Sequence, residues 1–462
     1  MSERLYACVD VGTTRIKLSV FDENLRSRHA ESLSVPVGAD GLQDAEELFR
    51  AVRHLADKGR ELGAKSLGLA TYRASTVAWD KEGKPLTPIV TWTDRGSALT
   101  YRRLGAHLKL LGKIPPFDLI ISPYSPVLKF LRLRELNPSL APGSMQWTVE
   151  SYLAYRLTGR FVSDATNACL SGIVDPRSMK EIGIVKSIFR LRMETPELVG
   201  NAQTIGSYGE MEVNALIADQ QAASVAEGSY EGGIAKVTNG TGTFVDIPTA
   251  GFARRGELIP LVLLKHRGRV WFGVEGYLPA TGRAIDSMIA TGLPRDYADL
   301  EVERTGDVIF IPAFSGLQVP RIPNAKGLIA GLTLGLDRES IVSGFLKSVA
   351  FHVRLVIAQS GERPDVLRAD GGLSRSNALL KTISAATGMT VERDRELEAT
   401  SRGIAMLQMV STGQSSLEEL NKAKREREAF TEPGDAKLEE EYQKWKKTTG
   451  LLKSSKGSYL VE

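Results

Sequence analysis

The sequence has 462 residues, which is more than a single hydrophobic core usually supports, so two domains are expected. Its apolar and charged fractions of 42% and 25% are typical of an ordinary soluble globular protein and exclude a disordered or fibrous chain. The formal net charge of +4 is small and, apart from a lysine-rich final segment, spread along the chain. We therefore expect no nucleic-acid-binding surface.

The cysteine content and the apolar segments predict a cytoplasmic protein. Cys8 and Cys169 are far apart in the sequence, which favours reduced core thiols over a disulfide or a metal site. Asp10 interrupts the apolar stretch that a signal peptide would need, and no segment approaches about 18 uninterrupted apolar residues. We expect neither export nor a membrane-spanning segment.

The first half of the chain alternates predicted strands and helices. CVDVGTTRIKLSVFD predicts two strands around a tight turn, and Leu48, Val52 and Leu55 in residues 42–64 recur at helical spacing. KSLGLATYR and KPLTPIVTW predict extended segments. PVLKFLRLREL and TVESYLAYRLTG predict helices, the second ended by Gly159. This order predicts an α/β fold with a mixed sheet.

The second half repeats the opening pattern. EGGIAKVTNGTGTFVDIPTAG, residues 231–251, again gives an apolar strand, a glycine and threonine turn and an alternating strand, which indicates an internal duplication. Each hairpin is expected to open one domain, residues 1–227 and residues 228–462. Extended segments, the long helix SIVSGFLKSVAFHVRLVIAQSG and the strand with its glycine turn DVLRADGGLSRSN follow. LEEEYQKWKKTTGLLKSSKG predicts a charged, solvent-facing helix and a loose tail.

The two glycine and threonine turns are candidate phosphate-binding sites. Their backbone N–H groups and threonine hydroxyls suit phosphate oxygens. For either turn alone, a simple tight hairpin is the plainer interpretation. One turn in each half instead favours a nucleotide held across a cleft between two domains. GRELGAKS lacks the spacing of a P-loop, and no G-x-G-x-x-G follows a predicted strand.

Asp10 ends the first predicted strand beside the first turn. A carboxylate facing bound phosphates would be repelled unless Mg²⁺ lay between them, directly or through its waters. Asp10 is therefore a candidate metal ligand. The structural alternative is an aspartate that hydrogen-bonds to its own turn.

Seven segments, in order along nearly the whole chain, resemble the FGGY carbohydrate kinases of the actin-like ATPase fold, and within that family the glycerol kinases. DVGTTRIK and TNGTGTF resemble its two phosphate loops, and IADQQAASVAEG resembles the motif that carries its catalytic aspartate. LRADGGLSRSN resembles its adenosine loop. The others are TYRASTVAWDKEGKPLTPIVTWTDRGSA, SPYSPVLKF and IPAFSGLQVPRIPNAKGLIAGL. The resemblance implies two actin-like, ribonuclease H-like domains with mixed sheets flanking a deep cleft.

The resemblance also implies a role for each matching residue. Asp219 would be the general base, and Asp94 and Arg95 would support the polyol pocket. Its substrate-binding residues would be Arg73, Trp92, Tyr124, Asp219, Gln220 and Phe244. The residues facing ATP and Mg²⁺ would be Asp10, Thr13, Thr14, Lys17, Gly240 and Thr241, and the adenosine would lie against Gly282, Gly372 and Asn377.

Four of these residues, and the nearby Trp79, also have an ordinary structural interpretation. Asp219 precedes a helical pattern and would serve as an N-cap, worth about 1 kcal/mol. Arg73 could form a surface salt bridge, and Tyr124 could simply pack. Trp79 and Trp92 could be core aromatics.

Departures from the family pattern concern the substrate more than the reaction. Ala74 stands where glycerol kinases carry a glutamate that accepts a substrate hydroxyl. PRIPNA lacks the usual aspartate of the inter-domain segment, and Lys17 replaces a common arginine, which loses the bidentate fork. Xylulose kinases typically carry Met-His where this chain has Tyr72 and Arg73, so a small linear polyol is favoured over a pentulose.

The resulting hypothesis is ATP-dependent phosphorylation of a primary hydroxyl of a small polyol, with glycerol as the first candidate. Alternatives are an FGGY kinase for another polyol or ketose, such as erythritol, ribulose or xylulose, and a non-catalytic actin-like sensor. By resemblance, a homodimer is possible.

Overall fold

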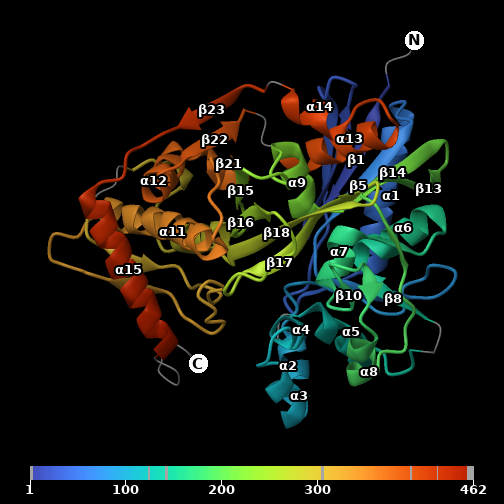
Figure 1. The fold of residues 1–462 in the computed structure, drawn as a ribbon, viewed down its shortest axis with the longest axis horizontal. Coiled ribbons are helices and arrows are strands. Elements are labelled where there is room, and N and C mark those ends of the chain that lie inside the picture. The colour runs from blue at the N-terminus through green and yellow to red at the C-terminus, as the bar shows by residue number, and fades with distance from the viewer. Residues whose placement is uncertain are drawn as a thin grey trace. The chain divides into compact units, whose positions relative to one another are not determined.

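The computed structural model describes residues 4–122, 125–140, 144–302, 306–395, 398–423 and 425–454. Its contacts divide the chain into two compact units, and each unit is formed by three separate segments of the sequence (Figure 1). Unit 1 comprises Met1–Ala226, Leu261–Trp271 and Glu398–Ala423, and unit 2 comprises Glu227–Pro260, Phe272–Leu397 and Lys424–Glu462.

The division predicted between residues 227 and 228 differs from these units in two segments. Residues 261–271 and 398–423 lie in the second half of the sequence but make their contacts in unit 1. In the first segment, the N–H of Lys265 donates to Asn201 Oδ1 at 2.8 Å, and the N–H of Asn201 donates to Lys265 O at 2.8 Å. The second segment contains the helix α13 (Ala399–Ser411), which packs on strands of unit 1.

Unit 1 is built on a mixed six-stranded sheet in the order β13-β14-β5-β1-β2-β3. β1 runs antiparallel to β2 and parallel to β5, and β5 runs parallel to β14. This is the α/β architecture that the sequence predicted. The strands are β1 (Tyr6–Val11), β2 (Arg15–Phe21), β3 (Ser27–Ser34), β5 (Ser66–Thr71), β13 (Ala202–Tyr208) and β14 (Met211–Ala218).

The other large sheet repeats the same pairing pattern in the order β17-β18-β16-β15-β21-β22-β23, and its strands β16, β15, β21 and β22 lie in unit 2. β15 runs antiparallel to β16 and parallel to β21, and β21 runs parallel to β22. The duplication seen in the two turn sequences therefore extends to strand topology. The strands are β15 (Ile234–Asn239), β16 (Thr243–Thr249), β17 (Ile259–His266), β18 (Arg269–Leu278), β21 (Val366–Asp370), β22 (Thr390–Asp394) and β23 (Arg427–Phe430).

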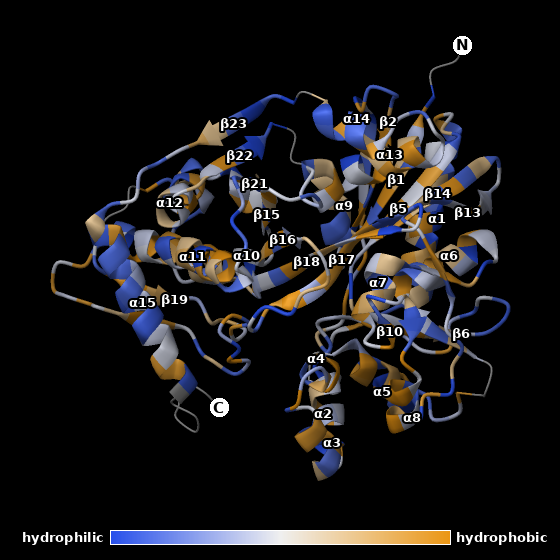
Figure 2. Cartoon of the chain, viewed as in Figure 1, coloured by the Kyte–Doolittle hydropathy of each residue, from blue (hydrophilic) through white to orange (hydrophobic). Residues whose placement is uncertain are grey.

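Helices cover both faces of β1 because successive side chains of a strand point to opposite faces. Ala7 faces α1 (Ala45–Glu61), where a Cβ on Gly59 would lie 2.7 Å from the Cβ of Ala7. Cys8 faces α13 and its Sγ donates to Gln408 Oε1 at 3.1 Å. β1 and β5 are coloured mainly hydrophobic in Figure 2, as expected for strands buried on two sides. Asp10 shares the face of Cys8, so its carboxylate lies on the α13 side.

One helix among the described residues, α11 (Arg338–Ser360), is long and apolar enough to cross a membrane by length and composition. Of its most apolar stretch, 89% is buried inside the structure, which identifies it as a core helix of unit 2. It begins at the N-cap Asp337, whose carboxylate accepts the N–H of Ser340, and it ends at Gly361 with φ of 71°.

The C-terminal helix α15 (Ala436–Ser454) is not only a solvated, charged face as predicted. Leu438, Tyr442 and Trp445 are 2 to 4% exposed and form a buried stripe at helical spacing. Trp445 Nε1 also donates to Phe310 O at 3.1 Å. In Figure 2 the helix accordingly shows both hydrophilic and hydrophobic residues. The predicted loose tail falls on residues 455–462, which lie outside the described part of the chain.

The remaining elements connect these layers. Two helices have the sequence-predicted positions, α5 (Pro126–Leu136) and α6 (Val149–Thr158), the latter ended by Gly159 in a left-handed conformation. The other strands are β4 (Leu42–Gln43), β6 (Thr76–Trp79), β7 (Ile89–Val90), β8 (Met145–Thr148), β9 (Val162–Asp164), β10 (Val174–Asp175), β11 (Lys180–Glu181), β12 (Glu197–Val199), β19 (Ile309–Ile311) and β20 (Leu328–Ala330). The other α-helices are α2 (Gly96–Arg103), α3 (Ala106–Leu111), α4 (Phe117–Ile120), α7 (Ala165–Leu170), α8 (Gly183–Phe189), α9 (Asp219–Glu227), α10 (Gly282–Ile289), α12 (Asn377–Thr387) and α14 (Leu417–Lys422), and two short 3-10 helices are η1 (Tyr297–Leu300) and η2 (Gly372–Arg375).

Candidate active site

The first predicted phosphate turn joins β1 to β2 in unit 1. The N–H of Gly12 donates to Arg15 O at 3.0 Å, and a Cβ on Gly12 would lie 2.7 Å from that oxygen, so the turn requires glycine. Thr13 is held from two sides. Trp92 Nε1 donates to its Oγ1 at 2.9 Å, and Gln43 Nε2 donates to its carbonyl oxygen at 2.9 Å. Thr14 is exposed beside it.

Asp10, the predicted metal ligand, lies in a cluster of charges. It pairs with Lys17 across the hairpin register, and Lys17 forms an ion pair with Glu398, directly before α13. Burial raises the pKa of Asp10 to about 7, with further increases from the charges of Asp219 and Glu398, while Lys17 opposes the shift. Three carboxylates thus act on one another near the end of β1.

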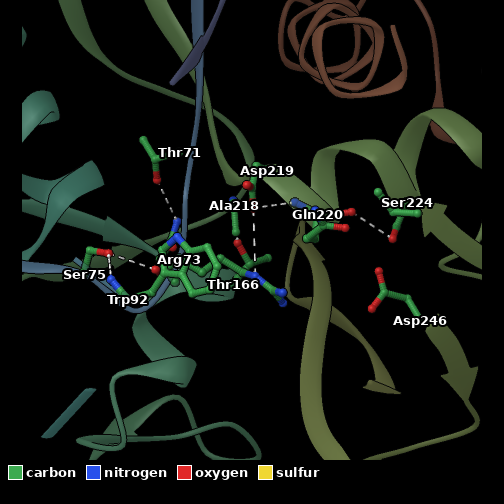
Figure 3. A network of polar contacts seen from close by, with 12 residues as sticks. Thr71, Arg73, Ser75, Trp92, Thr166, Ala218, Asp219, Gln220, Ser224 and Asp246 are labelled. Atoms are coloured by element: carbon green, nitrogen blue, oxygen red, sulfur yellow. Dashed lines mark hydrogen bonds and ion pairs between the residues drawn. The ribbon is translucent and has the colours of Figure 1, made fainter. Parts of the chain in front are cut away.

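Asp219 is the first residue of α9, immediately after β14. Its Oδ1 accepts the N–H of Gln220 at 2.7 Å and lies 3.9 Å from Arg73 Nε (Figure 3). The bond to Gln220 differs from that of an N-cap, whose side chain accepts the N–H two or three residues on. The Asp219 side chain remains 25% exposed next to a guanidinium group.

Arg73 belongs to a tight turn that also positions Trp92. Ala74 stands in place of the expected glutamate and has φ of 55°. This left-handed conformation is unfavourable for residues other than glycine. Ser75 Oγ donates to Arg73 O at 3.1 Å and accepts the N–H of Trp92 at 2.9 Å. Trp92 is 36% exposed and is therefore not a core aromatic, whereas Trp79 is fully buried.

Four further residues were predicted to form or support the polyol pocket. Asp94 Oδ2 accepts the N–H of Ser97 at 2.6 Å, which fixes the loop after Trp92, and Arg95 is exposed. Tyr124 lies outside the described residues. Phe244, from unit 2, stacks on Tyr277 with ring centroids 5.2 Å apart.

The second predicted phosphate turn, between β15 and β16, packs against the start of α10 in unit 2. The N–H of Gly240 donates to Gly242 O at 2.9 Å, and the N–H of Gly282 donates to Gly240 O at 3.1 Å. A Cβ on Gly282 would approach Gly240 O to 2.6 Å, so this contact needs glycine. Thr241 is exposed on the turn, and its carbonyl oxygen accepts the N–H of Thr281 at 2.9 Å.

Asn239 joins this turn to the predicted adenosine loop. It is fully buried, its Nδ2 donates to Ser374 Oγ at 3.1 Å, and its Oδ1 accepts from Thr243 Oγ1 at 3.1 Å. Gly371, with φ of 85°, passes so close that a Cβ there would lie 2.5 Å from Asn239 O. The predicted residue Gly372 has open space instead. The structure therefore brings the turn at Gly240 and the loop at Gly372 together through Asn239.

Asn377 begins α12 and is exposed. Its backbone N–H donates to Glu301 Oε1 at 2.9 Å, and the next N–H, of Ala378, donates to Glu301 Oε2 at 3.1 Å. The first turn of this helix is thus already bound by an anionic side chain, because the N-terminus of a helix attracts negative charge.

Sequence reasoning missed Gln43, Glu398 and Asn239. No motif identifies Gln43 and Glu398, because only tertiary contacts place them near the site. Gln43 lies just before α1, and Glu398 lies just before α13. Asn239 had a signal, since it directly precedes the second glycine and threonine turn.

The donor set at Asp10 suits a magnesium ion that keeps most of its waters. In the described ranges, no group of three or more His, Cys, Asp and Glu side chains is arranged to hold a metal ion. Mg²⁺ commonly binds through one or two carboxylates together with substrate phosphates, and excess negative charge around Asp10 favours a cation there. The residues present therefore fit this ion.

Comparisons with known proteins agree with this arrangement. Residues 5–211 match the N-terminal domain of the FGGY family of carbohydrate kinases, and residues 235–412 match its C-terminal domain. An uncharacterized sugar kinase of Archaeoglobus fulgidus is 30% identical over an alignment covering 97% of this chain and 99% of the relative. A glycerol kinase of Coxiella burnetii is 28% identical, with 95% and 96% covered.

A solved structure shows the same fold. The crystal structure of Plasmodium falciparum glycerol kinase with ADP matches with a TM-score of 0.86 and 23% identity, covering 97% of this chain and 98% of that chain. Both domain matches, nearly full-length sequence similarity and the duplicated mixed sheets lead to one conclusion. The chain belongs to the FGGY family of carbohydrate kinases.

Proposed function

We propose that this carbohydrate kinase transfers the γ-phosphoryl group of ATP to a primary hydroxyl of a small linear polyol, with glycerol the leading candidate. The observation that carries the proposal is the pair formed by Asp219 and Arg73, a partly exposed carboxylate 3.9 Å from a mostly buried guanidinium group. A kinase needs a base for the acceptor hydroxyl and a cation that orients the acceptor, and this pair supplies both.

In the proposed reaction, Asp219 accepts the proton of the attacking hydroxyl as the new P–O bond forms. Arg73 would bind a neighbouring hydroxyl oxygen, and Gln220 would add a polar contact. Trp92 is held by Ser75 and Thr13, so its exposed indole would form an apolar wall for the carbon chain. Positioning of this kind supplies most of the rate enhancement in phosphoryl transfer.

The phosphates would contact the two glycine and threonine turns. In unit 1 these contacts would come from Thr13, Thr14 and Lys17, and in unit 2 from Gly240 and Thr241, with the adenosine against Gly282, Gly372 and Asn377. Asp10 would hold Mg²⁺ directly or through water. When bound, the ion would neutralise phosphate charge during transfer.

The identity of the acceptor is the least determined part of the proposal, because Ala74 replaces a residue of the glycerol site. Without the glutamate expected at this position, one hydroxyl acceptor is missing from the glycerol site, which favours a different polyol or a ketose as the second candidate. A non-catalytic sensor is disfavoured because Asp219 and Arg73 are both present at short range. A cytoplasmic location and a homodimer remain expectations from composition and resemblance.

A substrate panel tests the proposal directly. Release of ADP from ATP and Mg²⁺ would be measured with glycerol, erythritol, ribulose and xylulose, and we expect the strongest stimulation by glycerol. Stimulation by another acceptor alone would reassign the substrate. Slow hydrolysis that no acceptor changes would support the sensor and reject the kinase.

A variant of Asp219 tests the mechanism. Asp219→Asn should keep ATP binding and lose roughly 10² to 10⁴ in turnover, because an amide cannot take the hydroxyl proton. Asp337→Asn is the matched control, since asparagine caps a helix about as well as aspartate and residue 337 only caps α11. Near-normal turnover of Asp219→Asn would remove this residue from the mechanism.

A further inference from the structure

A buried hydrogen-bond network at the start of α7 connects the ends of two central strands of unit 1. The N-cap Asp164 accepts the N–H groups of Thr166 and Asn167 at 2.8 and 3.2 Å through Oδ1. The hydroxyl of Thr166 donates to the same oxygen and accepts the N–H of Ala218 at 2.9 Å. Figure 3 shows Thr166 next to Ala218 and Asp219. The hydroxyl therefore transmits the position of Asp164 to the end of β14.

A neighbouring branch of the network reaches β5. Asn167 Nδ2 donates to Asp164 Oδ2 at 2.8 Å and approaches Thr71 Oγ1 at 3.5 Å. Thr71 is the last residue of β5, two positions before Arg73, and Ala218 is the last residue of β14, one position before Asp219. One helix start thus contacts both strands that present the proposed acceptor-site pair.

We expect the network to be rigid because its members are inaccessible to water and have several partners. Thr71, Asp164 and Thr166 are fully buried and Asn167 is 2% exposed. Asn201 Nδ2 donates to Asp164 Oδ1 at 3.1 Å, which adds a contact from the loop before β13. A buried carboxylate with this many donors has one favourable position, since any displacement would leave a charged oxygen unsatisfied.

We propose that Thr166 is a positioning residue for phosphoryl transfer: its hydroxyl, fixed by Asp164, holds Ala218 and so sets the place of Asp219 relative to Arg73. The proposal rests on the kinase function proposed above. Thr166 does not contact the reacting atoms. Its effect is on the geometry of the base, and displacing a catalytic group by about 1 Å can cost about 10²-fold in rate.

The first experiment compares Thr166→Val with Thr166→Ser, on the acceptor that gives the highest turnover with the unaltered protein. Valine keeps the shape but removes the hydroxyl, and kcat should fall about 10- to 100-fold with little change in KM for ATP. Serine keeps the hydroxyl and should restore most of kcat. Thr449→Val is the control, because it removes the hydroxyl of another buried threonine, in α15, which donates to the backbone carbonyl of Trp445.

The second experiment does not depend on turnover. Hydrogen exchange of a peptide spanning residues 214–220 should be faster in Thr166→Val and unchanged in Thr166→Ser, because the Ala218 N–H loses its acceptor only in the first variant. If Thr166→Val does not fold, Thr166→Ala makes the same test with a smaller side chain. Unchanged exchange overturns the positioning role even if the kinase proposal stands.

The outcomes separate the two proposals. If the unaltered protein phosphorylates no acceptor, the proposed function fails, while the exchange rates still decide whether Thr166 holds β14. If an acceptor is phosphorylated and Thr166→Val keeps its kcat, the positioning role is overturned and the function stands. A fall in kcat that serine does not reverse also overturns it.

Discussion

Replacement of Asp10 by asparagine should stabilise the ligand-free protein while impairing its activity. Burial and the charges of Asp219 and Glu398 hold the pKa of Asp10 at about 7, against an ordinary value of 3.8. Such a carboxyl destabilises the folded state once it is ionised. Its cost is absent below the ordinary pKa, grows as pH rises from about 4 to about 7, and is complete above the folded pKa.

The size of the effect follows from the difference between the two pKa values. One pKa unit corresponds to about 1.4 kcal/mol, so a rise from 3.8 to about 7 corresponds to about 4 kcal/mol at most. Asparagine loses the attraction to Lys17 as well, which reduces the gain. We expect Asp10→Asn to unfold with a free energy about 2 to 4 kcal/mol higher than the unaltered protein at about pH 8, and with nearly the same free energy at about pH 4.

Urea unfolding in the presence of a chelator measures this difference. Tryptophan fluorescence is suited to it, because Trp79, Trp92, Trp147 and Trp271 lie in unit 1 and only Trp445 lies in unit 2. A less stable Asp10→Asn protein at about pH 8, or a difference that does not change between about pH 4 and pH 8, would refute the assignment of a strained carboxylate.

Asp22, directly after β2, provides a control of opposite sign. Burial acts against its charge, but the N–H groups of Arg26 and Asn24 and the guanidinium of Arg28 together hold the pKa of Asp22 below its usual value. Its stabilising contribution is present above the ordinary pKa and is lost as pH falls through the folded value. Asp22→Asn should therefore destabilise the protein at about pH 8, where Asp10→Asn stabilises it.

Three further substitutions test other parts of the structure. Asn239→Ala should weaken ADP binding measured by calorimetry, because it releases the second phosphate turn from Ser374; unchanged affinity would exclude this role. Trp445→Ala should lower the free energy of unfolding by about 3 to 5 kcal/mol in a thermal or urea assay, since it removes a buried aromatic from the α15 stripe. Ala74→Gly should raise the free energy of unfolding by about 1 kcal/mol in the same assay, because only glycine adopts φ of 55° without strain. A loss of stability would contradict that explanation.

The sequence predicted those features whose signals are local. Alternating apolar residues and glycine turns indicated both hairpins, and the repeat of one pattern indicated the duplication that the two sheets display. Asp10 became a candidate because it ends a recognisable strand beside a glycine turn, whereas Arg73 became one only through the resemblance of its segment to the FGGY kinases. Helices with strong caps, such as the one ended by Gly159, were placed within a residue or two.

Features created by tertiary contacts could not be predicted in this way. Glu398 meets Lys17 only because α13 returns to the sheet of unit 1, and nothing in its own neighbourhood marks it as part of the site. In the sequence Thr166 is an ordinary threonine at a helix start, and only the fold brings the N–H of Ala218, at the end of β14, to its hydroxyl. The buried stripe of α15 was not predicted for another reason. The charged residues around Trp445 dominate the composition of the helix.

The charges around the proposed base would influence the form in which a nucleotide reaches unit 1. Asp10, Asp219 and Glu398 outweigh Lys17 and Arg73, and the raised pKa of Asp10 is the direct consequence of that excess together with burial. A triphosphate approaching this cluster would be repelled unless it brought a cation with it. Burial, and after it this excess of negative charge, destabilises the ionised form of Asp10 in the ligand-free protein, and the same negative charges would favour entry of the proposed nucleotide as a magnesium complex.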